Sequence, residues 1–389
     1  LYQSGLFSYQ GNFSGFLSDF VTFGTLKSKM GTIKTDVSVL PKADGLIAYK
    51  GKISTTDFNI GSLFKIEDLG RLTFNGEANG DYRIKSQKIS GLFKGEITKI
   101  EAHGYEYKNI HLDGYYKDKM FDGMVNMNDS NLQFTFKGKA DVSKEMPEFD
   151  FNVQLDKALP ANLNLIHNFP KSELAFNMRA RFSGNKLDNL KGIILVNDGY
   201  FKNQNGVLGL NGIQLISIPK QSAMELAFNS DYFDVRIEGN YQFQDLVYSI
   251  KKSLNKFVPT LKLETPPDFK ANIFDYKINV KNLDDITHVF VPGLTVETPF
   301  FLYGKIDSNQ SNFELEGSVP GFSYRNIWFR NIFVSNKAIN NEYVSKIKIK
   351  EITRKNSNVI YNFSVNSSIS ENVLKNKIEW FANRDSSGY

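Results

Sequence analysis

The sequence contains no cysteine, so it can form neither a disulfide framework nor a thiolate metal site, and it has no cysteine nucleophile. A chain of 389 residues, 41% of them hydrophobic, has enough apolar material to form a core without disulfides. The absence of thiols is typical of proteins in an oxidising compartment such as the bacterial periplasm.

Long apolar segments are also missing. No run approaches the ~18 apolar residues of a membrane-spanning helix, and the first residues do not have the pattern of a signal peptide. The chain begins at Leu1 and not at methionine, so we expect it to be a section of a longer protein.

No block of like charge occurs. The formal net charge is +5, and basic and acidic residues are interspersed along the chain. A nucleic-acid-binding surface gathers basic residues on one face, so we expect no nucleic-acid partner. Acidic lipid headgroups stay open as partners.

Residues that carry chemistry are few. Only two of the four histidines are near each other in the sequence, and no third ligand accompanies them (His103, His111, His167 and His288). We therefore expect no metal site and no cofactor.

Catalytic motifs are likewise missing. The segment Gly11-Asn12-Phe13-Ser14-Gly15 has its serine one place too late for a nucleophile elbow. Gly51-Lys52 is followed by isoleucine where a phosphate-binding loop has serine or threonine. Scattered carboxylates leave a glycosidase pair open, but nothing brings two of them together. We expect no catalytic residues and no enzyme activity.

A short motif recurs along the chain: a large apolar residue, a residue that is usually polar, and a glycine. Its first and third residues lie on the same face of a strand, and glycine within a strand marks a bend, a bulge or a close backbone approach. The motif indicates a bending sheet, and it occurs at Tyr9-Gln10-Gly11, Tyr49-Lys50-Gly51, Phe74-Asn75-Gly76, Phe93-Lys94-Gly95, Leu112-Asp113-Gly114, Phe121-Asp122-Gly123, Phe136-Lys137-Gly138, Phe182-Ser183-Gly184, Ile237-Glu238-Gly239, Leu302-Tyr303-Gly304 and Leu315-Glu316-Gly317.

Between the glycines, apolar and polar residues alternate with a period of two. This pattern predicts strands with one apolar and one solvated face. A β-sandwich, in which two apolar faces close on each other, produces the same alternation. Because the motif continues without an evident boundary, we favour one long, curled sheet that forms an apolar groove (an all-β fold). Bends are expected near Gly76, Gly95, Gly138 and Gly239.

Short helices interrupt this pattern. Residues 245–257 are predicted to form an amphipathic helix, packed through Leu246, Ile250, Leu254 and Phe257. Shorter helices are expected near residues 158–169 and over residues 284–290. The predicted organisation is three β-groove segments, 1–155, 156–244 and 259–389, with the helix 245–258 between the last two.

Several segments, in this order, resemble the TamB proteins of Bacteroidota, which belong to the AsmA-like family. The likeness spans nearly the whole chain and is carried by Gly15-Phe-Leu-Ser-Asp-Phe-Val-Thr-Phe-Gly24, Gly31-Thr-Ile-Lys-Thr-Asp36, Leu69-Gly-Arg-Leu-Thr-Phe-Asn-Gly76, Gly104-Tyr-Glu-Tyr-Lys-Asn-Ile-His-Leu-Asp-Gly114, Phe121-Asp-Gly123, Asn229-Ser-Asp231, Ile237-Glu-Gly239, Phe257-Val-Pro259 and Val289-Phe-Val-Pro-Gly293.

This resemblance implies a periplasmic, bridge-like protein that shelters phospholipid between the inner and outer membranes and takes part in outer-membrane biogenesis. It implies an inner-membrane anchor and an Omp85-type outer-membrane partner, both through parts of the protein outside this chain, which would be a middle section. The alternation and the resemblance together suggest one concave surface in contact with acyl chains, lined by Phe134, Phe136, Phe149, Phe151, Val153, Ile237, Tyr241 and Phe243.

A second hypothesis stays open. The sheet could instead be a structural or assembly scaffold whose strand edges template outer-membrane β-barrel proteins, without conducting lipid. A wide, unfilled apolar interior favours the conduit, and an interior filled by side chains favours the scaffold.

Overall fold

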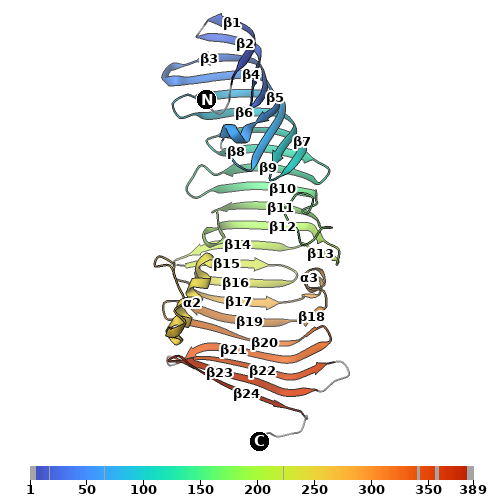
Figure 1. The fold of residues 1–389 in the computed structure, drawn as a ribbon, viewed down its shortest axis with the longest axis vertical. Helices are drawn as coiled ribbons and strands as arrows, with labels where there is room; N and C mark the ends of the chain where they lie inside the picture. Colours follow the sequence, from blue (N-terminus) through green and yellow to red (C-terminus); the bar gives the residue numbers. More distant parts are fainter. Residues whose placement is uncertain are drawn as a thin grey trace. The chain divides into compact units, whose positions relative to one another are not determined.

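The computed structural model describes residues 6–16, 18–64, 66–221, 223–339, 342–354 and 359–382. The fold is nearly all β, with 67% strand and 9% helix, and its strands form one 24-stranded antiparallel sheet that is not closed. The predicted fold class, a long β-sheet with a few short helices, is confirmed (Figure 1).

The chain divides into two compact units. The first contains residues 1–183 and 198–204, and the second contains residues 184–197 and 205–389. Strand β12 (Lys191–Lys202) contributes to both.

In the first unit, each strand pairs antiparallel with the next strand along the chain, from β1 to β11. The elements are β1 (Ser8–Phe16), β2 (Asp19–Ser28), β3 (Gly31–Pro41), β4 (Leu46–Asn59), α1 (Ile60–Phe64), β5 (Leu69–Arg83), β6 (Lys88–Ala102), β7 (Tyr105–Lys117), β8 (Met120–Asn128), β9 (Leu132–Asp141), β10 (Glu148–Ala158) and β11 (Glu173–Ser183).

The second unit is also mainly a meander, with two departures from sequential pairing. Strand β12 pairs with β14, and β17 pairs with β19. Strand β20 pairs with β19 along one part of its length and with β18 along another. Its other elements are β13 (Val207–Gly209), β14 (Ile213–Lys220), β15 (Ala223–Asn229), β16 (Phe233–Asn240), α2 (Leu246–Phe257), β17 (Ile273–Val280), α3 (Asp284–Phe290), β18 (Leu294–Glu297), β19 (Phe300–Asp307), β20 (Asn312–Tyr324), β21 (Ile327–Ile339), β22 (Glu342–Arg354), β23 (Ile360–Ser370) and β24 (Val373–Phe381). Single 3₁₀ turns lie at Ala43–Gly45, Leu187–Asn189, Phe243–Asp245 and Pro259–Leu261.

Strand register keeps the apolar residues on one face. Val153 of β10 lies opposite Phe136 of β9 and Met178 of β11, whereas the preceding residue, Asn152, is exposed on the other face. Each antiparallel pairing preserves this arrangement because residues directly opposite each other point to the same side of a sheet.

Motif glycines lie where neighbouring strands approach each other closely. A methyl group on Gly304 would lie 1.9 Å from the carbonyl oxygen of Glu314, and one on Gly76 would lie 2.4 Å from that of Lys94. In a flat sheet, facing Cβ atoms are ~5 Å apart. The strands are therefore inclined toward each other on the face to which these missing side chains would point. This is the apolar face, so the sheet bends toward its apolar side at these positions.

Aromatic rings cover several of these glycines. A methyl group on Gly114 would lie 2.6 Å from the ring of Phe121, and one on Gly76 would lie 2.5 Å from the ring of Phe74. Such rings shield backbone that glycine leaves bare. The ring belongs to the same motif at Gly76 and to the motif of the facing strand β8 at Gly114. In both cases an aromatic motif residue provides the cover and the glycine provides the space.

The longest predicted helix is confirmed as α2, and the prediction for residues 284–290 is confirmed as α3. The packing face of α2 differs from the predicted one, however. Phe257 is buried, but Ile250 is 41% exposed, and the buried side of the helix includes Ser249 and Ser253. The helix is rotated because Ser249 accepts a hydrogen bond from the buried Asn272 side chain (3.0 Å).

The helix predicted near residues 158–169 is wrong. Residues 159–172 form turns. Two asparagine side chains of this loop donate hydrogen bonds to distant partners, Asn162 to the Asn131 side chain (3.0 Å) and Asn164 to the carbonyl of Gly104 (3.2 Å). Asparagine often makes such contacts in turns rather than helices, and here they hold the loop across neighbouring strand ends.

A methyl group at Gly304, where two strands approach closely, should destabilise the sheet. Gly304→Ala is expected to lower the free energy of unfolding by about 1–3 kcal/mol, because the strand must move away from Glu314. The matched control is Gly209→Ala in the same unit, where the nearest atom is 3.5 Å away, with an expected change within about 0.5 kcal/mol. Urea unfolding followed by circular dichroism measures both. Equal effects of the two substitutions would contradict a close approach of the strands at Gly304.

Candidate functional site: the apolar face of the sheet

Five of the sequence-predicted residues lie together in the first unit. Phe134 and Phe136 are on β9, and Phe149, Phe151 and Val153 are on β10. All five are only partly buried, and the register places them on one face.

Phenylalanine rings form a continuous row across four strands of this face. The ring of Phe136 lies 6.1 Å from Phe121 and 5.2 Å from Phe151, and Phe149 stacks on Phe182 at 4.7 Å. Aromatic rings at such separations stabilise one another beyond the area they bury. The row presents a rigid apolar surface from β8 to β11.

The loop 159–172 covers one part of this face. Leu163 is 1% exposed and forms a buried cluster with Leu155 and Ala158. Phe134 and Val153 pack against that cluster. At these two residues the face is therefore partly filled by the protein's own side chain.

The other three predicted residues lie in the second unit. Ile237 and Phe243 pack against a buried cluster of Leu226, Tyr241 and Phe274. Tyr241 is 2% exposed, its ring stacks on Phe243 at 5.0 Å, and burial raises the pKa of its hydroxyl. Leu246, the first residue of α2, packs on the same cluster. Tyr241 thus has little surface left for a ligand.

A second row of apolar residues crosses the same unit and was missed from the sequence. It consists of directly opposed, partly buried aliphatic side chains on β17, β19, β21, β22 and β23, with Gly317 of β20 between the second and third. These are Ile278, Leu302, Val334, Ile347 and Val365, here called the aliphatic row. Two signals could have identified them: alternation with polar residues at Ile278, Ile347 and Val365, and the motifs ending at Gly304 and Gly317.

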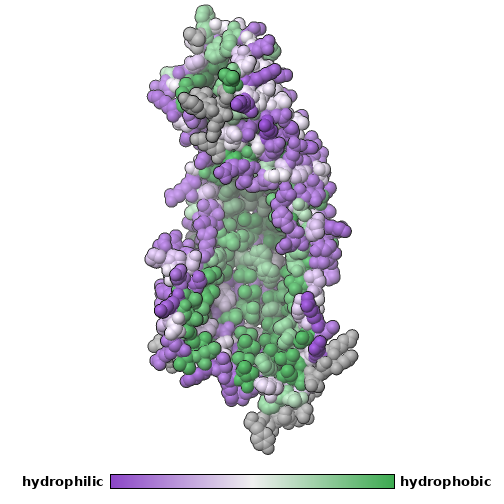
Figure 2. Space-filling view, viewed as in Figure 1, coloured by the Kyte–Doolittle hydropathy of each residue, from purple (hydrophilic) through white to green (hydrophobic). Residues whose placement is uncertain are grey.

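Figure 2 shows this face of the second unit as a hydrophobic, hollowed surface between hydrophilic margins. All five side chains of the aliphatic row are only partly buried. The chain exposes 23,900 Å², whereas a compact protein of 44.2 kDa exposes about 15,500 Å². Apolar side chains that would form a closed core in a β-sandwich are here half exposed.

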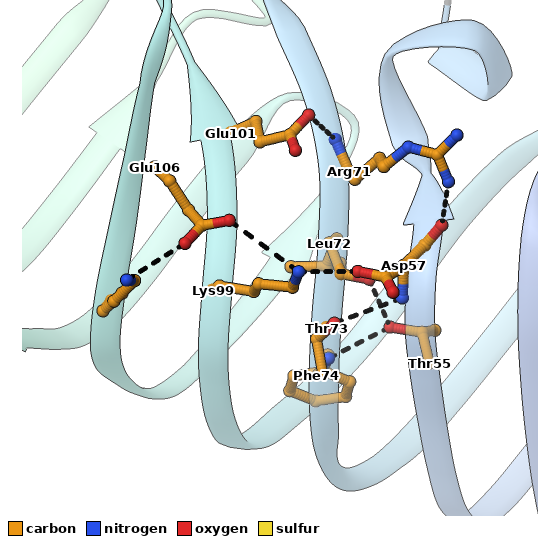
Figure 3. Close-up of polar contacts among 10 residues, drawn as sticks. Thr55, Asp57, Arg71, Leu72, Thr73, Phe74, Lys99, Glu101 and Glu106 are labelled. Atoms are coloured by element: carbon orange, nitrogen blue, oxygen red, sulfur yellow. Dashed lines mark hydrogen bonds and ion pairs between the residues drawn. The ribbon is translucent and has the colours of Figure 1, made fainter.

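A polar cluster on the first unit links side chains of β4, β5 and β6 to backbone groups (Figure 3). It lies where the register shifts along β4, β5 and β6. Side chains there bind backbone groups: Thr55 donates to the carbonyl of Leu72, and the amides of Phe74 and Asp57 donate to Thr55 and Thr73. These contacts replace sheet hydrogen bonds that a bulge removes.

Charges complete this cluster. The Lys99 ammonium lies 2.8 Å from Asp57 and 3.7 Å from Glu106, and Arg71 donates to the carbonyl of Asp57 at 3.0 Å. The hydrogen bond from Lys99 and its charge lower the pKa of Asp57. Within the described ranges, no three histidine, aspartate or glutamate side chains gather in a way that could hold a metal ion.

A further recess lies elsewhere in the first unit. Its volume is about 630 Å³, and it is lined by polar residues from β4 to β7 and the turns that follow. Ion pairs join Lys42 to Asp81 (3.3 Å) and Lys88 to Asp118 (3.1 Å) around it, so both carboxylates of its lining are already paired. The apolar face is the stronger candidate site.

No family model, curated protein or solved structure matches this chain. No helix in the described part of the chain is long and apolar enough to cross a membrane.

The polar cluster should make stability sensitive to acid. The pKa of Asp57 is lower in the folded chain than its ordinary value of 3.8, so its ion pair stabilises the fold above that pH. The stabilisation is lost as the pH falls through the lowered value. Lys99→Met is therefore expected to lower the urea midpoint at neutral pH, and its difference from the parent chain should shrink below about pH 4.

Urea unfolding at a series of pH values checks this expectation. Lys50→Met, which removes an exposed lysine from β4, is the control and should show no such trend. A difference between Lys99→Met and the parent that stays constant with pH would contradict the role of the ion pair.

Proposed function

We propose that the apolar face of this sheet shelters the acyl chains of phospholipids as they move between the inner and outer membranes. The observation that carries the proposal is the partly exposed apolar face, formed on successive strands and, among the described residues, covered only in part by loop 159–172 and by α2. Exposed apolar surface of this extent is rare on soluble proteins unless it binds something.

The energetics suit an acyl chain as the ligand. Exposing one methylene to water costs ~0.8 kcal/mol, so a sixteen-carbon chain would cost on the order of 12 kcal/mol if left unsheltered. A carrier must therefore offer apolar surface on every successive strand of the sheet. Within the second unit, the aliphatic row supplies this surface on five strands. On β17, β22 and β23, polar residues alternate with it on the outward side.

The proposal includes a periplasmic location, an anchor in the inner membrane and an Omp85-type partner at the outer membrane. These parts depend on the resemblance of the sequence to TamB proteins. The apolar, bending sheet is consistent with that family.

One observation favours the scaffold hypothesis. Leu163 and its loop fill the face beside Phe134 and Val153, as side chains would in a scaffold with a closed interior. The filled part is local, because Phe136, Phe149 and Phe151 remain partly exposed. A test of the conduit should therefore use these open positions.

Photocrosslinking at two adjacent residues of β10 separates the two faces. A benzophenone side chain at position 151 is expected to capture phospholipid, and one at position 152 is not, because Asn152 is exposed on the polar face. Lipid on the crosslinked chain is measured by mass spectrometry. Equal capture at both positions, or none at either, would favour the scaffold.

A charge on the apolar face should repel acyl chains. With the crosslinker at position 149, Phe151→Glu is expected to reduce lipid capture about tenfold or more, because acyl chains cannot solvate a carboxylate. The rings of Phe149 and Phe151 are 6.3 Å apart, so the probe reports on the same level of the face. The control Asn152→Glu should leave capture unchanged, since a carboxylate can still accept the hydrogen bond from Arg179 (2.9 Å).

A further inference from the structure

The helix α2 and the turn after it carry an unusual charge distribution. Residues 246–263 contain four lysines and no carboxylate, although the whole chain has 47 basic and 42 acidic residues. The four are Lys251, Lys252, Lys256 and Lys262, here called the α2 lysines. Within the described residues, none of them forms an ion pair with an acidic side chain.

Three of these ammonium groups are held in place by other contacts. Lys251 lies over the ring of Tyr248 (5.5 Å), and Lys252 lies over the ring of Phe269 (5.6 Å). Lys256 lies near the ring of Phe257 and donates to the carbonyl of Gln310 (3.1 Å). Aromatic faces and a carbonyl position the cations without neutralising them.

Apolar side chains lie beside these cations. Val247 is 59% exposed, Ile250 41% and Leu261 50%. Lys251 follows Val247 by four residues and precedes Leu254 by three, so these three side chains share one face of the helix. An exposed apolar strip bordered by lysine therefore matches the two parts of an anionic phospholipid, its acyl chains and its headgroup.

The helix is fixed to the sheet at both ends. At its start, the buried Asn272 side chain donates to Ser249 (3.0 Å) and to the carbonyl of Gln242 (3.1 Å). At its end, the carbonyl of Phe257 accepts a hydrogen bond from the amide of Asn372 (3.1 Å), and its ring lies 5.7 Å from Tyr343. Lys251, Lys252 and Lys256 therefore lie on a helix that is attached at both ends.

This element borders the apolar face. Leu246 belongs to the cluster formed with Ile237 and Phe274, and Phe257 contacts Tyr343 on β22, the strand that carries Ile347. Figure 1 shows α2 across strand ends at the left margin of the second unit, and in Figure 2 the hydrophobic surface extends toward that margin, where hydrophilic groups lie.

We propose that the α2 lysines bind the phosphate of an anionic phospholipid whose acyl chains lie on the apolar face of the second unit. This inference depends on the proposed function and adds to it a headgroup preference and the residues that produce it. The unneutralised charge favours a headgroup with net negative charge over a zwitterionic one, since the ammonium of phosphatidylcholine would repel the lysines.

The test compares two lipids with the same acyl chains. The 389-residue chain is incubated with an equimolar mixture of dioleoyl phosphatidylglycerol and dioleoyl phosphatidylcholine and repurified, and its bound lipids are quantified by mass spectrometry. We expect phosphatidylglycerol to be enriched. The triple variant Lys251→Gln, Lys252→Gln and Lys256→Gln should lose that enrichment, at about fivefold per lysine, while keeping its total bound lipid.

The matched control removes three lysines from the same unit. Lys346, Lys348 and Lys350 are exposed on β22, and changing them to glutamine alters the net charge equally but should leave the enrichment intact. Circular dichroism verifies that both variants keep the parent fold.

Other outcomes would overturn the proposal in distinguishable ways. Equal binding of the two lipids by the parent chain, or enrichment that survives in the triple variant, would overturn the headgroup site and leave the acyl-chain proposal standing. Absence of any bound lipid would overturn both. Reduced sedimentation of the triple variant with phosphatidylglycerol vesicles, with an unchanged ratio of loaded lipids, would assign the lysines to docking on a membrane surface instead.

Discussion

The close approach of neighbouring strands at glycine is the constraint on which the rest of this structure depends. At Gly304 and Gly76 the adjacent backbone occupies the space where a Cβ atom would be. The direction of the bend follows, because the missing side chain would have pointed to the apolar face. Since the large residue of each motif lies two places before the glycine, it falls on the same side. One tripeptide therefore specifies the bend and also which surface lies inside it.

Bending has a cost in backbone hydrogen bonds, which the polar face helps to offset. Where the register shifts between β4 and β6, amides and carbonyls lose their partners in the sheet. Threonine hydroxyls and an arginine take these positions, and the ion pair of Lys99 with Asp57 lies beside them. The outward face is thus both a solvated surface and a source of replacement hydrogen-bonding groups.

Much of the fold could be predicted from the sequence because strands of this kind are locally encoded. The period of two identified the faces, and the spacing of Leu246 and Phe257 identified α2. The errors arose where contacts distant in the sequence decide the outcome. Asn164 reaches Gly104, sixty residues away, and holds its loop out of a helix. The contact between Ser249 and Asn272 turns Ile250 toward solvent.

The candidate site was predictable to a similar extent. Alternation indicates on which face a residue lies, but it does not indicate what covers that face. Phe151 remains partly open, whereas Tyr241, with the same alternation, is buried in the cluster on which α2 packs. The aliphatic row was missed because the prediction depended mainly on aromatic side chains, although Ile347 and Val365 follow the same pattern.

The order of strand pairing has a consequence for how such a protein changes over time. Nearly every strand bonds only to strands close to it in the chain, as β5 does to β4 and β6. Stability in such an array is approximately a sum of neighbouring terms. Insertion or loss of one complete hairpin would leave every other residue on its original face of the sheet, because two strands restore the original direction of the chain. The length of the apolar surface can therefore vary in steps of a hairpin, by duplication or deletion of a few tens of codons, without a new fold having to arise.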